Sequence, residues 1–278
     1  MTTITLVHPG SMGAAVGAHA ARSGARVLWL PAGRSAETRE RARQAGFEPV
    51  DSLCQALAVS DIVLSICPPQ YAEDVAEDIT AHAFDGVFVD ANAISPERMS
   101  RIAALVTARC PGSQVVDGSI FGPPPVNGKR IRLYVAGQDT SAVERVFKGT
   151  DVIVQPMAAP LGSASALKMA FASYQKAART LAAVAHSLAH EHGVGDLLTK
   201  EAHIMASDIL SNPDYLPSVA ARAWRWRPEM HEVADALRSA ALPTDLAEAT
   251  AKVMKRWEAD KDDLDLPLAE ILAHLKDG

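Results

Sequence analysis

The stretch Ile4-Thr-Leu-Val-His8-Pro-Gly10-Ser-Met-Gly13 decides the fold of the first half of the chain. Ile4–Val7 is a short apolar run typical of a buried strand, and apolar residues recur at helical spacing from Met12 to Ser23. Gly10 and Gly13 occupy the second and third positions of a G-x-G-x-x-G turn, whose glycines let the backbone approach a pyrophosphate. His8 stands at the first position. The stretch therefore predicts a strand, a tight turn and a helix that bind a dinucleotide.

The same alternation of strand and helix continues to about residue 157. Further strands are predicted at 27–30, 62–67, 87–90 and 115–117, with helices at 36–45, 52–58, 72–82 and 96–108. Strands that alternate with helices at this spacing favour βαβ units and a buried parallel sheet. Residues 133–136 and 152–154 are predicted to add two edge strands. We expect an α/β, Rossmann-type domain over residues 1–157.

An all-α domain is expected over residues 158–278. Residues 164–189 are rich in alanine and long enough for a helix of roughly seven turns. Further helices are predicted at 197–210, 215–225, 230–240, 244–257 and 267–275. A helix so rich in alanine allows close approach of another helix but gives little apolar bulk for a private core. We therefore expect a homodimer that pairs two such domains.

Composition and charge exclude several classes of protein. The hydrophobic fraction of 48% and the charged fraction of 22% are those of an ordinary globular protein. A net charge of −6 without a basic stripe argues against a nucleic-acid partner. The chain shows no signal-peptide pattern and no membrane span, and Cys54, Cys67 and Cys110 lie far apart, as in a reduced cytoplasmic protein.

The second strand indicates which cofactor binds. An acidic residue normally follows this strand and binds a free ribose, but here the sequence is Pro31-Ala-Gly-Arg34-Ser35. Arg34 and Ser35 suit a 2′-phosphate, which favours NADP(H); the alternative is a solvated loop arginine. Cys67, Pro68 and Asn92 follow the next two predicted strands and are expected to line the nicotinamide half, although Asn92 could be a turn residue. The predicted cofactor-binding residues are Gly10, Ser11, Met12, Gly13, Arg34, Ser35, Cys67, Pro68 and Asn92.

Lys168 is the one charged residue in the mostly apolar stretch Gly162–Tyr174. An ammonium there must either reach water along its alkyl stem or serve a function, because desolvating it without a partner costs several kcal/mol.

Four motifs occur in an order that resembles the β-hydroxyacid dehydrogenase superfamily, which includes 6-phosphogluconate and 3-hydroxyisobutyrate dehydrogenases. They are Gly10-Ser-Met-Gly13 with Gly17, Asp90-Ala-Asn-Ala-Ile-Ser95-Pro96, Asp117-Gly-Ser-Ile-Phe-Gly122 and the Gly162–Lys168 segment. The C-terminal stretch with Trp224, Trp226 and Glu229 resembles a subgroup that ends in a domain of unknown function. The resemblance implies an NAD(P)-dependent oxidoreductase in which Lys168 is the general acid/base.

Two residues depart from the family pattern. Ala172 stands where the resemblance implies an assisting amide, and Phe121 stands where it implies a substrate-binding serine. Gln175, one turn further along the helix, and Ser119 are the predicted substitutes, which with Lys168 complete the catalytic set. The loop Gly118–Gly122 is expected to offer backbone N–H groups to a carboxylate. The predicted substrate-binding residues are Gly118, Ser119, Gly122, Tyr174 and Trp224.

The leading hypothesis is an NADPH-dependent oxidoreductase that acts on a small hydroxy- or oxo-acid. An imine reductase is the second, since its fold is similar but it usually has an aspartate or tyrosine at the position of Lys168. A non-catalytic NADPH-binding protein is the third. No metal site is expected, because the His186/His190 pair lacks a third ligand.

Overall fold

The computed structural model describes residues 1–276. It consists of two compact units, Met1–Lys168 and Met169–Gly278. The division falls after Lys168, within a single long helix, whereas the sequence pattern puts the domain boundary at residue 157. Among the described residues, none of the helices is long and apolar enough to cross a membrane.

The first unit is built on one eight-stranded sheet with the strand order β3-β2-β1-β4-β5-β6-β7-β8. All neighbouring strands are parallel except β6 and β7, which are antiparallel. The strands are β1 Thr3–Leu6, β2 Arg26–Trp29, β3 Glu48–Pro49, β4 Ile62–Ser65, β5 Val87–Asp90, β6 Gln114–Phe121, β7 Ile131–Ala136 and β8 Val152–Pro156. The predicted Rossmann-type α/β fold, followed by a helical part, is confirmed.

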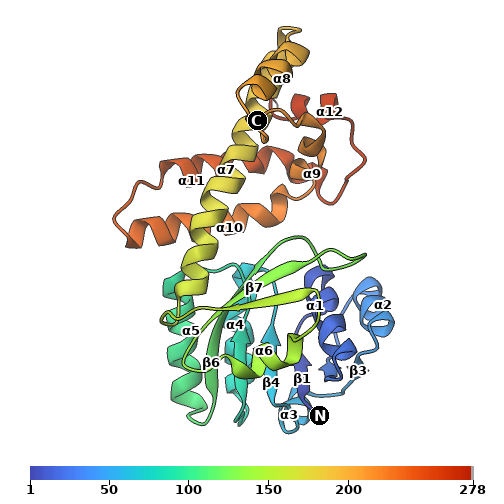
Figure 1. Ribbon diagram of the computed structural model, residues 1–278, viewed down its shortest axis with the longest axis vertical. Helices are drawn as coiled ribbons and strands as arrows, with labels where there is room; N and C mark the ends of the chain where they lie inside the picture. Colours follow the sequence, from blue (N-terminus) through green and yellow to red (C-terminus); the bar gives the residue numbers. More distant parts are fainter. Residues whose placement is uncertain (277–278) are drawn as a thin grey trace. The chain divides into compact units, whose positions relative to one another are not determined.

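Helices cover both faces of this sheet, because side chains of successive strand residues point to opposite sides. Ile62 and Leu64 of β4 join a core with α1, α2 and α6, while Val63 joins a core with α3, α4 and α5. The helices are α1 Ser11–Arg22, α2 Ala36–Gln44, α3 Leu53–Leu57, α4 Ala72–Thr80, α5 Pro96–Arg109 and α6 Ser141–Phe147. Figure 1 shows them around the sheet.

Three local expectations for this unit are wrong. Of the two strands predicted at an edge, only β8 lies there, because β7 lies between β6 and β8; the opposite edge of the sheet is β3. β6 does not end at Asp117 but runs on to Phe121, because residues 117–121 pair with β7. The sequence analysis also missed β3 and α6, since two and seven residues are too short to give a clear periodic pattern.

The second unit contains helices only among its described residues. α7 Ser163–Glu191 enters it from the first unit as one unbroken helix (Figure 1). α8 Gly195–Ile204, α9 Leu216–Ala220, α10 Ala223–Ser239, α11 Asp245–Met254 and α12 Leu268–Ala273 follow. α10 continues through Pro228, where the sequence analysis expected a break. The core includes Trp257, which is fully buried and donates its indole N–H to the Ile271 carbonyl at 2.8 Å.

Candidate active site

The turn between β1 and α1 leaves its helix N-terminus open to an anion. Gly10 caps α1 without a side-chain hydrogen bond, and the first turn carries no acidic residue. A Cβ added to Gly10 would meet no atom within 4 Å, whereas a Cβ on Gly13 would lie 2.2 Å from the His8 carbonyl oxygen. Gly13 is thus required by packing, and Gly10 faces open space. Ser11 is exposed beside it, and Met12 packs partly against the core.

Arg34 and Ser35 lie at the turn between β2 and α2. Ser35 caps α2, since its Oγ accepts a hydrogen bond from the Thr38 amide at 3.2 Å. Arg34 Nη2 donates to the Val7 carbonyl at 3.2 Å, and Arg39 Nε donates to the Arg34 carbonyl at 3.2 Å. Arg34 Nε is buried and has no hydrogen-bond partner among the described residues. The turn therefore gathers two guanidinium groups and a helix N-terminus at the end of β2.

Asn92 links the loops that follow β4 and β5. Its Oδ1 accepts a hydrogen bond from the Cys67 amide at 2.5 Å, and its Nδ2 donates to Ser65 Oγ at 3.0 Å and to Asp90 Oδ2 at 2.9 Å. The residue is only 3% exposed. The two bonds donated by Nδ2 fix the Asn92 side chain, and its Oδ1 then positions the Cys67-Pro68 loop through the Cys67 amide. Pro68 is exposed on this loop, and burial raises the pKa of the Cys67 thiol to about 12.

Asp90, at the carboxyl end of β5, and Asp117, in the middle of β6, are buried neighbours. Burial raises the pKa of Asp90 to about 7, and it raises that of Asp117 as well. Asp117 Oδ2 accepts hydrogen bonds from the amides of Ala164 at 2.9 Å and Ser165 at 3.0 Å, and its Oδ1 accepts from Ser165 Oγ at 2.7 Å. Asp117 therefore caps the N-terminus of α7 from the sheet, a role that the sequence analysis missed.

Lys168 lies in the first turns of this capped helix and is half-buried. Its Nζ donates a hydrogen bond to the Ile120 carbonyl at 2.7 Å and lies 4.9 Å from the centre of the Phe121 ring. Both partners belong to the part of β6 that extends beyond Asp117. The carbonyl and the aromatic ring together hold the ammonium at this position.

The predicted loop Gly118–Gly122 is a strand up to Phe121, so the expected anion-binding nest is wrong: an extended strand does not turn successive N–H groups to one side. Gly118 is closely packed there, because a Cβ would lie 3.0 Å from the Asp90 carbonyl oxygen. Gly122 ends the strand with φ of +124°. Ser119 is 1% exposed, and its Oγ has no hydrogen-bond partner among the described residues.

Three of the predicted residues lie in the second unit. Tyr174 is 70% exposed, and Gln175 is half-buried on the next position of α7. Trp224 donates its indole N–H to Asp262 at 3.0 Å and stacks under the Lys261 ammonium. The roles proposed for these side chains remain predictions.

Lys176 is a charged group in the second unit to which the sequence analysis gave no role. It is 4% exposed, forms an ion pair with Glu229 and lies 5.7 Å from the Trp226 ring. Burial lowers its pKa. No local pattern in the sequence indicates the ion pair between Lys176 and Glu229, because the two residues are 53 positions apart.

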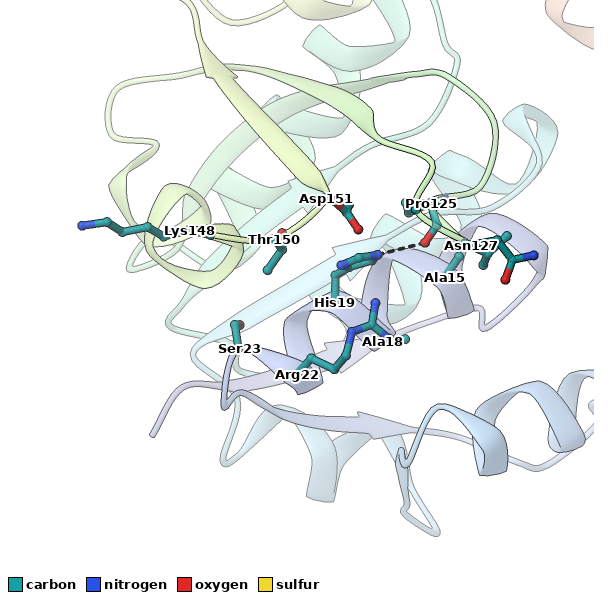
Figure 2. Close-up of a pocket in the computed structure, with 13 residues that line it drawn as sticks. Ala15, Ala18, His19, Arg22, Ser23, Pro125, Asn127, Lys148, Thr150 and Asp151 are labelled. Carbon is teal, nitrogen blue, oxygen red and sulfur yellow. Dashed lines mark hydrogen bonds between the residues drawn. The ribbon is translucent and has the colours of Figure 1, made fainter.

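A depression of about 810 Å³ lies along the C-terminal half of α1. Figure 2 shows His19 at its base, where Nε2 makes a hydrogen bond with the Pro125 carbonyl at 2.8 Å. Arg22 and Asn127 lie at the rim. None of the sequence-predicted site residues lines this depression. It is therefore separate from the strand-end site, which we define as Gly10–Gly13, Arg34, Ser35, Cys67, Pro68 and Asn92.

Substitution of the two turn glycines tests the geometry of the turn. We expect Gly13→Ala to lower the free energy of unfolding by about 1–3 kcal/mol or more, because its methyl group would overlap a backbone oxygen. Gly10→Ala is the matched control and should cost less than about 1 kcal/mol, since its methyl group meets open space. Urea unfolding of both variants measures the difference, and equal losses would contradict this account of the turn.

Comparisons with known proteins agree with this architecture. Residues 189–257 match the model of a domain of unknown function, DUF1932. An uncharacterized 28.5 kDa protein in the 7S RNA 5′ region of Methanothermus fervidus is 25% identical over 166 residues, which make up 60% of this chain and 62% of that protein.

Solved structures extend the similarity over nearly the whole chain. A conserved protein of unknown function, reported as structurally similar to 3-hydroxyacid dehydrogenases, is 25% identical with a TM-score of 0.70 over 93% of this chain and 97% of its own. The Mycobacterium tuberculosis 3-hydroxyisobutyrate dehydrogenase with L-serine is 19% identical, with a TM-score of 0.77 over 99% of both chains. A reductive aminase from Aspergillus terreus with NADPH and ethyl levulinate is 17% identical, with a TM-score of 0.61 over 99% of both chains.

These findings confirm the resemblance drawn from the four motifs and from the C-terminal stretch. The chain has the fold of the 3-hydroxyacid dehydrogenases, with a DUF1932 domain in its C-terminal part.

Proposed function

We propose that the protein is an NADPH-dependent oxidoreductase that transfers a hydride between NADP(H) and a small hydroxy- or oxo-acid. The proposal rests on the position of Lys168. This residue lies on the helix that Asp117 caps, and its ammonium donates a hydrogen bond to the Ile120 carbonyl. Oxidoreduction with a nicotinamide cofactor is supported by neighbours that are dehydrogenases and an NADPH-bound reductive aminase. The choice of NADP(H), the substrate class and the role of Lys168 are our inferences.

The residues at the carboxyl edge of the sheet fit a dinucleotide. The N–H groups of Ser11, Met12 and Gly13 at the open N-terminus of α1 would hold the pyrophosphate. Arg34 and Ser35 would hold a 2′-phosphate, and the buried Arg34 Nε without a partner is a donor that such an anion would satisfy. The Cys67-Pro68 loop, fixed by Asn92, would border the nicotinamide. When bound, the cofactor supplies or accepts the hydride.

Lys168 would move the proton that the reaction requires. Reduction of a carbonyl group needs a proton at its oxygen, and oxidation of a hydroxyl group needs the reverse transfer. The Ile120 carbonyl orients Nζ, and the Phe121 ring excludes water from one side of it. Ser119 Oγ lies on the same strand extension and would donate a hydrogen bond to the substrate. Gln175 remains the proposed substitute for the assisting amide, and Gly118, Gly122, Tyr174 and Trp224 remain proposed substrate contacts.

Reduction of an imine is the second candidate, favoured by the similarity to reductive aminases. A panel of hydroxyacids, ketoacids and cyclic imines, followed by the absorbance of NADPH, separates the two reactions. Turnover of the acids alone supports the leading proposal, and turnover of imines alone supports the alternative. Tight NADPH binding without turnover of any compound would indicate a non-catalytic binding protein.

The preference for NADP(H) is predicted to depend on Arg34. Charge-assisted hydrogen bonds contribute roughly 1.5–3 kcal/mol, so Arg34→Ala should weaken NADPH binding about 10- to 100-fold and leave NADH binding nearly unchanged. Arg43→Ala removes a positive charge from the far end of α2 and is the matched control. Calorimetry of the unsubstituted protein and of both variants with each cofactor measures the six affinities; equal or tighter binding of NADH by the unsubstituted protein would contradict the proposal.

Lys168→Met tests the role of the ammonium, because methionine keeps the length and apolar stem of the side chain. We expect kcat to fall about 10²- to 10⁴-fold while NADPH binding stays within a few-fold of normal. Lys148→Met is the control for loss of an exposed lysine. Near-normal turnover of the Lys168→Met variant would show that the ammonium merely reaches solvent.

We also propose that the protein is a homodimer. α7 carries an exposed apolar stripe at helical spacing within the second unit, formed by Phe171, Tyr174, Leu181, Val184 and Leu188. Leu197 and Ile204 of α8 are also exposed. A second copy of the chain would bury such a stripe across a two-fold axis.

Introducing a charge into this stripe tests the homodimer. Leu181→Glu combined with Leu188→Glu should convert a dimer into a monomer at micromolar concentration, because the pairing would bury unpaired carboxylates. Leu264→Glu alters another exposed leucine outside the stripe and should leave the dimer intact. Light scattering reports the molecular mass, and a monomeric unsubstituted protein would refute the pairing.

A further inference from the structure

His8 lies beside the strand-end site, and the proposed function gives its side chain no role. It occupies the first position of the glycine turn, where its carbonyl oxygen accepts a hydrogen bond from the Gly10 amide at 2.9 Å. The imidazole Nδ1 is buried, yet it has no hydrogen-bond partner among the described residues. A buried polar atom without a partner is costly, and one beside a ligand site is commonly satisfied by the ligand.

The imidazole lies close enough to Arg34 for the two groups to interact electrostatically. Burial, together with the positive charge of Arg34, lowers the pKa of His8 to about 4. Arg34 donates to the carbonyl of Val7, the residue before His8, and its buried Nε also lacks a partner among the described residues. Two buried nitrogen atoms without partners among the described residues therefore follow the ends of the neighbouring strands β1 and β2, and Arg34 lies next to the N-terminus of α2.

An anion with several acceptor oxygens would satisfy both nitrogen atoms together. The negative charge of the anion would also oppose the two effects that keep His8 neutral in the free protein, which are its burial and, second, the positive charge of Arg34. A phosphate monoester has these properties: three acceptor oxygens and a charge between about −1.5 and −2 at neutral pH. A cofactor without this phosphate would leave the imidazole neutral.

We propose that His8 is a second contact for the 2′-phosphate of NADP(H) and that it takes up a proton when this cofactor binds. The inference rests on the proposed function and adds a residue that sets cofactor preference. Burial lowers the pKa of Arg34, but a guanidinium keeps its charge at ordinary pH. The Cys67 thiol stays neutral, because burial raises its pKa to about 12. His8 is therefore the protein group that changes its charge.

Linkage between proton binding and cofactor binding determines how NADPH affinity changes with pH. A bound dianion raises the pKa of His8 from its low value in the free protein, so the complex holds more protons than the free components. NADPH affinity should then rise as the pH falls from 8 to about 6, near the second pKa of a phosphate monoester. NADH affinity should stay flat over this range. Binding of the phosphate by Arg34 alone would instead release a proton from the ligand, which is the opposite sign.

Calorimetry in buffers of different ionisation enthalpy measures this proton directly. At pH 7, titration of the full chain with NADPH in PIPES, HEPES and Tris should show net uptake of about 0.3 to 1 proton, and NADH should show none. His8→Gln keeps a hydrogen-bonding side chain that cannot be protonated. It should abolish the uptake and weaken NADPH binding about 3- to 30-fold, with NADH binding unchanged.

The controls separate this inference from the proposed function. Arg34→Ala should weaken NADPH binding yet retain proton uptake, because His8 is still present. NADPH binding with no uptake or with proton release would overturn the role of His8 and leave the proposed function standing. Failure of the unsubstituted protein to bind NADPH would overturn both. The uptake of the unsubstituted protein decides the question even if a His8 variant does not fold.

Discussion

The buried carboxylate of Asp117 is the constraint on which the rest of the site depends. It accepts three hydrogen bonds from the first residues of α7, two from backbone amides and one from Ser165. A carboxylate at a helix N-terminus also interacts favourably with the helix dipole. These interactions offset the cost of burying the carboxylate, which is seen in its raised pKa. The cap fixes the start of α7 against the carboxyl end of the sheet. It therefore fixes the position of the Lys168 backbone, from which the side chain extends.

The extension of β6 beyond the parallel strands completes the geometry. β5 ends at Asp90, opposite Asp117, but β6 continues for four residues that pair with the antiparallel β7. The Ile120 carbonyl on this extension receives the Lys168 ammonium, and Ser119 carries a buried hydroxyl without a described partner. The cap of α7 and the long strand β6 thus bring the Lys168 amine, the Ile120 carbonyl and the Ser119 hydroxyl to the carboxyl end of the sheet. The glycine turn lies at the same end.

The sequence predicted the parts of the structure that local patterns determine. Apolar runs such as Ile62–Ser65 marked the parallel strands, and the glycine spacing marked the turn before α1. The cap by Asp117 could not be predicted, because Ala164 and Ser165 follow it in the sequence by 47 and 48 positions. The interior position of β7 likewise depends on which strands pair, and a periodic pattern does not encode that choice. Asn92 was placed correctly at a strand end, but its internal hydrogen bonds became evident only from the structure.

We propose that the strand ends around Gly10 and Arg34 form the cofactor site. Amide hydrogen exchange of the full chain, with and without saturating NADPH, tests it most directly, because a bound pyrophosphate and 2′-phosphate would engage backbone N–H groups there. The account predicts slower exchange at residues 10–13 and 34–38, and little change along the depression beside His19. Protection confined to that depression, or absent from residues 10–13, would contradict the account.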